Sequence, residues 1–126
     1  HAAISKFCYQ AALGKPITVW KTALDQKRPY LNLNDASKVI AFIIKKELFN
    51  GGVYNVVTSN FSVRQIINEI EKHIPNVKIE LVENKIMNNF SYNVSAQKII
   101  NEGFEFSSSI ENGIIDTLSL FKSIKL

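Results

Sequence analysis

Apolar residues follow two different periods along this chain, and the changes of period predict its secondary structure. Five stretches repeat apolar residues at spacings of three and four, which is typical of helices with one buried face. Short runs rich in Val, Ile, Trp and Tyr lie between them and favour β-strands. We expect helices over 2–13, from Asn34 or Asp35 to about Leu48, from Ser62 to before Pro75, from Ser95 to Gly103, and from Ser108 onward. We expect strands over Ile17–Trp20, Tyr30–Leu33, Val53–Val57 and 77–82. Apolar and polar residues alternate in the last of these, as in a strand with one buried face.

Polar residues at the expected helix starts support these helix positions. Ser62 with Gln65 forms a capping-box pattern, and Ser108 with Glu111 forms a second. In such a box, each side chain pairs with a backbone N–H group of the first turn that has no partner within the helix. Gly103 is a typical helix end because glycine adopts the left-handed conformation without strain.

Helices and strands therefore alternate through one unit without a linker, a repeat or a low-complexity segment. A chain of 126 residues has room for one domain. Its hydrophobic fraction of 46% is ordinary for a globular protein with a core. The sequence predicts an α/β fold, a small compact mixed helix-strand domain over residues 1–126.

The distribution of charge, the length of the apolar runs and the cysteine content limit the partners and the cellular compartment that we expect. The net charge is +4, but the basic residues are scattered and are not interleaved with aromatic residues, so we expect no nucleic-acid partner. The longest apolar run, Val39 to Ile44, is too short to span a bilayer, so we expect no membrane partner. Cys8 is the single cysteine and is expected to be a small buried hydrophobe, which fits a reducing cytoplasm.

No complete set of catalytic residues is recognisable. The five glycines lack the spacing of a dinucleotide-binding turn, and no Tyr-x-x-x-Lys pair exists. The cysteine and the two histidines lack the spacing of metal ligands. His73 is expected near the C-terminus of a helix, where a positive charge interacts favourably with the helix dipole. Glu69 is expected to be a charged residue on the surface. We therefore predict no catalytic residue, no cofactor site and no metal site in this chain.

A few polar residues stand in positions where their chemistry is informative. Arg28 precedes an apolar run, Asn60 follows the run Val53–Val57, and Asn88 and Asn89 precede two aromatic residues. Each has a plain structural interpretation as well. Arg28 fits a surface ion pair, Asn60 fits turn chemistry, and the two later asparagines fit a loop.

Taken in order, four segments resemble the C-terminal half of extended short-chain dehydrogenases/reductases. This family includes NAD-dependent sugar-nucleotide epimerases and 4,6-dehydratases. The first two segments resemble its Gly-(Lys/Gln)-Pro helix end and its Arg-Asp-(Tyr/Phe) stretch. The last two resemble its Tyr-Asn strand and its Asp-x-Ser-Lys helix. The segments are KFCYQAALGKPITVW, KRPYLNLNDASKVIAFII, GGVYNVVTSNFSVRQIINEI and SYNVSAQKIINEGFEFSSSIENGIIDTL.

The resemblance implies a substrate-binding role for particular residues. Trp20 corresponds to the aromatic residue near the nucleotide base, and Arg28 to the arginine on the diphosphate, where a guanidinium binds two oxygens at once. Asn60 corresponds to the asparagine after the Tyr-Asn strand. Asn88 lies where the family has a second arginine, and an asparagine donates more weakly to phosphate than an arginine does. Two further departures are Pro29 and Asn93, which both stand where the family has an acidic residue.

Two functional hypotheses follow. In the first, the chain is the substrate-binding part of an NAD-dependent sugar-nucleotide epimerase or dehydratase. The parent enzyme would then use NAD or NADP, and the partners would be an NDP-sugar, held weakly by this part alone, and the missing N-terminal Rossmann domain. In the second, the chain is a free-standing interaction or oligomerisation module without catalysis, for example a homodimer.

Overall fold

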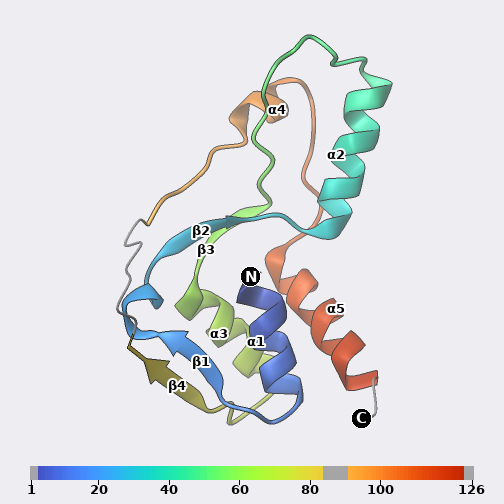
Figure 1. The fold of residues 1–126 in the computed structure, drawn as a ribbon. Helices are drawn as coiled ribbons and strands as arrows, with labels where there is room; N and C mark the ends of the chain where they lie inside the picture. The colour runs from blue at the N-terminus through green and yellow to red at the C-terminus, as the bar shows by residue number, and fades with distance from the viewer. Residues whose placement is uncertain (1–2, 84–90, 124–126) are drawn as a thin grey trace.

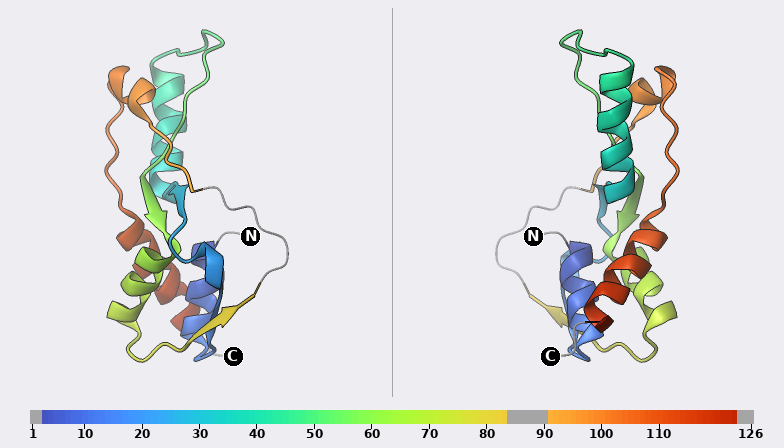
Figure 2. Two further views of the ribbon diagram at one scale, coloured as in Figure 1. Left: turned by 90° about the vertical axis from the view of Figure 1, so that its left-hand side faces the viewer. Right: turned by 90° about the vertical axis from the view of Figure 1, so that its right-hand side faces the viewer.

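The computed structural model describes residues 3–83 and 91–123. Helices and short strands alternate along the chain, as the sequence predicted, and together they form an elongated molecule (Figures 1 and 2). The elements are α1 (Ala3–Ala12), β1 (Ile17–Trp20), the 3-10 turn η1 (Lys21–Ala23), β2 (Lys27–Tyr30), α2 (Leu33–Lys45), β3 (Ser59–Ser62), α3 (Val63–His73), β4 (Ile79–Val82), α4 (Gln97–Asn101) and α5 (Ile110–Ser123).

The larger hydrophobic core lies among α1, α3, α5 and β1, in the lower half of Figure 1. Strand β1 pairs in parallel with β4, and Ile17 stands opposite Ile79. Cys8 is fully buried in this core, which confirms its predicted role as a small hydrophobe. The buried members of the core are Phe7, Cys8, Ala11, Ile17, Val19, Ile66, Ile67, Ile70, Ile110, Ile114 and Leu118.

A second, smaller core lies between α2, α4 and the extended segments beside them, in the upper half of Figure 1. Its aromatic rings pack edge to face, since Phe104 contacts both Phe42 and Phe106 at centroid distances of 5.4 and 4.9 Å. The buried members are Val39, Val57, Ala96, Ile99 and Phe104. The antiparallel pair of β2 and β3 lies between the two cores.

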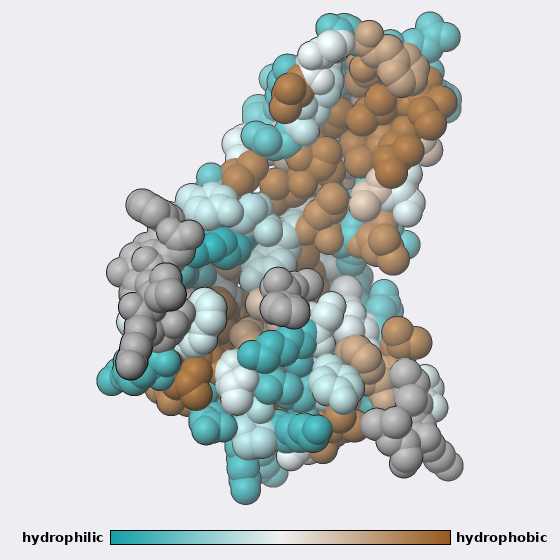
Figure 3. Space-filling model, in the orientation of Figure 1, coloured by the Kyte–Doolittle hydropathy of each residue, from teal (hydrophilic) through white to brown (hydrophobic). Residues whose placement is uncertain are grey.

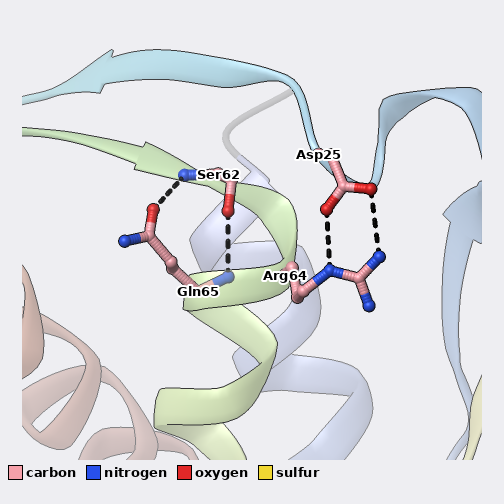
Figure 4. Close-up of polar contacts among 4 residues, drawn as sticks. All are labelled: Asp25, Ser62, Arg64 and Gln65. Atoms are coloured by element: carbon pink, nitrogen blue, oxygen red, sulfur yellow. Dashed lines mark hydrogen bonds and ion pairs between the residues drawn. The ribbon is translucent and has the colours of Figure 1, made fainter.

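The helix signals were mostly confirmed. Figure 4 shows the predicted capping box at α3, where Ser62 Oγ accepts from the Gln65 N–H at 3.2 Å and Gln65 Oε1 accepts from the Ser62 N–H at 2.8 Å. Gly103 has a φ of 97°, as expected for a helix end. The cap of α5 is one residue later than predicted, because Ser109 Oγ accepts from the Asn112 N–H.

The second and third strands were placed wrongly. Strand β2 is Lys27–Tyr30, and Leu31–Leu33 is not part of it, because Asn32 caps α2 by accepting from the Asn34 N–H at 2.9 Å. The apolar run Val53–Val57 does not form a strand, and β3 forms from the segment Ser59–Ser62 instead. Asn60 therefore lies within a strand. The positions of these strands depend on the pairing of β2 with β3, which are distant in sequence. The spacing of apolar residues carries no information about that pairing.

Two expectations about burial also failed. The alternating strand near residue 79 was expected to have one buried face, but Ile79 and Leu81 are 44% and 51% exposed. Glu69 was expected on the surface, but it is 8% exposed, with Lys72 Nζ 2.6 Å and His73 Nε2 3.5 Å from its carboxylate oxygens. No helix in the part of the chain that the structure describes is long and apolar enough to cross a membrane.

Candidate functional site

Arg28 lies in the middle of β2, opposite Phe61 of β3, and its side chain is half-buried. The guanidinium donates to the Lys27 carbonyl and to Gln26 Oε1, both at 2.8 Å. It also stacks on the ring of Tyr92, with 5.1 Å between the guanidinium carbon and the ring centroid. A cation held over an aromatic face keeps a fixed orientation and its full charge.

The other arginine of the chain shows what is unusual about Arg28. Figure 4 shows Arg64 bound in a fork to Asp25, with distances of 2.7 and 3.0 Å. Over residues 3–83 and 91–123, Arg28 has no carboxylate partner. The structure therefore does not support the plain interpretation of Arg28 as one half of a surface ion pair. Among the described residues, the hydrogen-bond partners of its guanidinium are neutral oxygens, so its charge is not neutralised by a carboxylate.

Tyr92, whose ring stacks on the Arg28 guanidinium, was not predicted from the sequence to be part of a site. Tyr92 is fixed beside β2 because its N–H donates to the Lys27 carbonyl at 3.3 Å. The preceding residue, Ser91, accepts from the Lys27 N–H at 3.0 Å. These contacts join segments far apart in the sequence, and no local pattern signals them.

Asn60 stands opposite Pro29 in the ribbon formed by β2 and β3. Its side-chain amide is bound twice to the backbone of Val94, with Nδ2 donating to the carbonyl at 3.0 Å and Oδ1 accepting from the N–H at 2.9 Å. These bonds hold the segment before α4 against β3. The observed role of Asn60 is to connect the two halves of the molecule.

Trp20 is the last residue of β1 and is 56% exposed. Among the described residues, no hydrogen bond or ring contact joins it to Arg28 or Asn60. The structure therefore does not bring the predicted site residues together in direct contact. Asn88 lies outside the described residues, as does its neighbour Asn89.

A pocket of about 470 Å³ opens between α1, α5 and the turn from β2 to α2, and Arg28 is not among the residues that line it. Tyr30, which lines this pocket, follows Arg28 by two residues, so both side chains lie on the same face of β2. Burial raises the pKa of Tyr30, and the positive charge of Arg28 opposes that rise. The pocket wall is mainly apolar, with polar groups from Ser5, Asn34, Asp116 and Thr117.

The described residues contain no group of three or more His, Cys, Asp or Glu side chains placed to hold a metal ion. The structure offers a guanidinium stacked on Tyr92 and, two residues further along β2, Tyr30 in the wall of a pocket of the size that small ligands occupy. A guanidinium of this kind has the chemistry to bind an anionic group.

No protein-family model matches the sequence. The fold, however, matches solved structures over nearly the whole chain. UDP-glucose 4-epimerase of Thermus thermophilus, solved with NAD, matches with a TM-score of 0.79 and 17% identity over 98% of this chain. The enzyme WbmF of Bordetella bronchiseptica, solved with NADH, matches with a TM-score of 0.77 and 21% identity over 96%. A partial consensus L-threonine 3-dehydrogenase matches with a TM-score of 0.80 and 18% identity over 96%.

These matches confirm the predicted fold class, a small mixed α/β unit that corresponds to part of an extended short-chain dehydrogenase/reductase fold. The chain spans 40%, 36% and 42% of the length of these three proteins. At these identities the likeness shows the fold, and the function has to be argued from the residues of the site.

Proposed function

We propose that this chain is the C-terminal, substrate-binding part of an NAD-dependent sugar-nucleotide epimerase or dehydratase. The observation that carries the proposal is Arg28, a guanidinium held on Tyr92 without any carboxylate partner among the described residues. Two of the solved structures with this fold contain NAD or NADH, and one of them is named as a UDP-glucose epimerase.

In this proposal Arg28 binds the diphosphate of the substrate through charge-assisted hydrogen bonds. The pocket lined by Tyr30, two residues further along β2, receives another part of the same molecule, with polar side chains from Ser5 and Asn34 in its wall. Trp20 stacks on the base, as the sequence resemblance implies. Asn88 is the candidate for a second, neutral donor to phosphate.

The residues of this chain do not fit a nicotinamide cofactor. None of its glycines has the spacing that lets a backbone turn approach a pyrophosphate. Hydride transfer is therefore assigned to the N-terminal Rossmann domain of the parent enzyme, with NAD or NADP bound there. This chain positions the substrate. A substrate that is already held in the reacting geometry loses less entropy on the way to the transition state.

Calorimetric titration of the full native gene product with UDP-glucose and other NDP-sugars tests the proposal. Replacing Arg28 by Ala removes charge-assisted hydrogen bonds, which corresponds to about 10- to 100-fold weaker binding. Arg28→Lys should retain part of the affinity, because lysine keeps the charge and loses the fork. Arg64→Ala is the matched control, because that guanidinium is already bound to Asp25.

Equal affinities of the wild type and Arg28→Ala for every NDP-sugar would remove the basis of the proposal. The 126-residue chain by itself should bind these ligands weakly or not at all, because it forms only part of the substrate cleft. A submillimolar Kd for the isolated chain would contradict that expectation while supporting the site.

A second candidate substrate class is a smaller anion such as an amino-acid carboxylate. The sequence has asparagine where the resemblance implies a second phosphate-binding arginine, and one solved structure with this fold is named as an L-threonine 3-dehydrogenase. NAD reduction by the native gene product with L-threonine, together with no binding of NDP-sugars in the titration, would favour this candidate over the first.

A further inference from the structure

Among the described residues, the guanidinium of Arg28 is held by neutral groups. Besides the ring of Tyr92, it contacts the Lys27 carbonyl and Gln26 Oε1, both at 2.8 Å. Gln26 is itself fixed, because its amide nitrogen donates to the Thr22 carbonyl at 3.1 Å. The two hydrogen bonds use two of the five N–H groups of an arginine, and the others have no acceptor within the described part of the chain.

Tyr92 has a fixed backbone, because its segment is bonded to both strands of the β2–β3 ribbon. On the β2 side, the Tyr92 N–H donates to the Lys27 carbonyl at 3.3 Å, and Ser91 Oγ accepts from the Lys27 N–H at 3.0 Å. On the β3 side, the side-chain amide of Asn60 is bound twice to the backbone of Val94. The ring of Tyr92 is therefore supplied to Arg28 by a segment that is held before and after it.

An aromatic ring fixes the plane of a guanidinium without neutralising its charge. The distance of 5.1 Å from the Arg28 guanidinium carbon to the centre of the Tyr92 ring lies within the range of about 6 Å for such contacts. Arg64 shows the alternative, since its guanidinium is paired with the carboxylate of Asp25. In Figure 3 the surface over the β2–β3 ribbon, at the middle left, is mainly hydrophilic, which suits a charged ligand.

We propose that Tyr92 is a positioning residue for anion binding: its ring sets the plane in which the remaining N–H groups of Arg28 meet the diphosphate of an NDP-sugar. Asn60 acts on the same site indirectly, because it fixes Val94, two residues after Tyr92. The inference rests on the proposed function and deepens it. It gives Asn60 a positioning role, where the sequence resemblance implies contact with the substrate.

The hydrogen bonds of Asn60 support the indirect role. Its amide nitrogen and its amide oxygen are both engaged with Val94, at 3.0 and 2.9 Å. A turn of this side chain toward a ligand would break both bonds and leave two backbone groups without partners. A guanidinium whose orientation is already set loses less freedom when it binds a phosphate group in a fork.

Calorimetric titration of the native gene product with UDP-glucose and with inorganic pyrophosphate tests the proposal. Tyr92→Leu removes the ring and keeps the backbone bonds of the segment, so both probes should bind about 2- to 5-fold more weakly. Tyr92→Phe keeps the ring and should retain the wild-type affinity. Tyr9→Leu is the control, because Tyr9 is exposed to a similar degree, 42% against 50%, and its ring packs on Phe121 of α5 instead.

Two double-mutant cycles distinguish positioning from direct contact. In an Arg28→Ala background, Tyr92→Leu should have no further effect, because the group that the ring orients is gone. Asn60→Ala should weaken binding in the wild type and add little in a Tyr92→Leu background. Additive losses from Asn60→Ala and Tyr92→Leu would contradict the indirect role and assign Asn60 to direct contact.

Wild-type affinity of Tyr92→Leu, together with weaker binding by Arg28→Ala, would overturn the positioning role and leave the proposed function intact. Equal losses for Tyr92→Leu and Tyr92→Phe would assign the effect to the tyrosine hydroxyl and would also overturn it. Unchanged affinity of Arg28→Ala for both probes would contradict the proposed function and this inference together.

Discussion

The side-chain amide of Asn60 forms two hydrogen bonds with the backbone of Val94, donating to its carbonyl at 3.0 Å and accepting from its N–H at 2.9 Å. This pairing imitates the bonds that a neighbouring strand would make with Val94. It joins the segment that leads into α4 to strand β3. The relative position of the two cores is therefore maintained in part by one side chain.

Replacing Asn60 by Ala should lower the free energy of unfolding by about 1–3 kcal/mol, because both backbone groups of Val94 lose their partner. Urea unfolding followed by circular dichroism measures the change. Asn93→Ala is the control, since Asn93 is exposed. If the Asn60→Ala protein is as stable as the control, the two bonds do not contribute in solution.

Asp35 is a buried acceptor that joins three segments. It is fully buried, and its carboxylate accepts from Thr58 Oγ1 at 2.8 Å and from the N–H groups of Ser107 and Ser108 at 3.2 Å. Asp35→Ala should destabilise the fold by about 1.5–3 kcal/mol, since bonds to a charged group are lost and buried donors remain.

Asp35→Asn should cost less than Asp35→Ala, because the amide oxygen still accepts from the two backbone N–H groups. Thermal unfolding of both variants tests this order. The exposed Asp116→Ala is the control and should stay within about 0.5 kcal/mol of the wild type. Equal losses for the two Asp35 variants would indicate that the carboxylate's charge, and not its accepted bonds, matters.

The sequence predicted those features that local chemistry determines. Ser62 and Gln65 stand three residues apart, so their capping box is visible without knowledge of the fold. The spacing of apolar residues likewise located all five helices to within a few residues. Strand β3 was missed because its polar residues pair with β2, and that pairing depends on residues distant in sequence.

The candidate site, too, could be predicted from the sequence only in part. Arg28 was singled out from its position before an apolar run, and the structure supports it by showing a guanidinium without a carboxylate among the described residues. Tyr92 was not recognised as its partner, because the contact is made only when the chain returns beside β2. Helix α2 was expected to bury one apolar face, yet Ile40 and Ile44 on it are 60% and 59% exposed, because the spacing of apolar residues does not tell which of them pack within the same chain.

The fork between Arg64 and Asp25 predicts a dependence of stability on pH. The hydrogen bond and charge of Arg64 hold the pKa of Asp25 below its ordinary value. Because the folded-state pKa is lowered, the stabilising contribution is present above the ordinary pKa of 3.8 and is lost as the pH falls through the folded-state value. Both side chains are exposed, so the effect is small and is screened by salt.

A double-mutant cycle of Arg64→Ala and Asp25→Asn measures this coupling by urea unfolding. The coupling should be favourable near about pH 7 and should be lost as the pH falls through the lowered pKa of Asp25. It should also shrink at about 1 M salt. A coupling that persists in acid would show that the pair acts through packing and not through charge.

Burial determines the reactivity of Cys8. The thiol is fully buried in the larger core, and loss of hydration raises its pKa to about 11. At about pH 8 the thiolate fraction is then roughly 100-fold lower than at the ordinary pKa of 9.0, so a thiol reagent should label the native protein at least that much more slowly. Labelling in about 6 M urea, where the chain is unfolded, supplies the reference rate.

Because the folded-state pKa of Cys8 is raised, its contribution to stability is present below the ordinary value of 9.0 and is lost as the pH rises toward about 11. Cys8→Ala removes this titration, so its stability should fall less steeply with alkaline pH than that of the wild type. Urea unfolding of the two proteins at several pH values compares the slopes. Rapid labelling of native Cys8 at a rate close to the unfolded reference would show that the core around α1 opens readily.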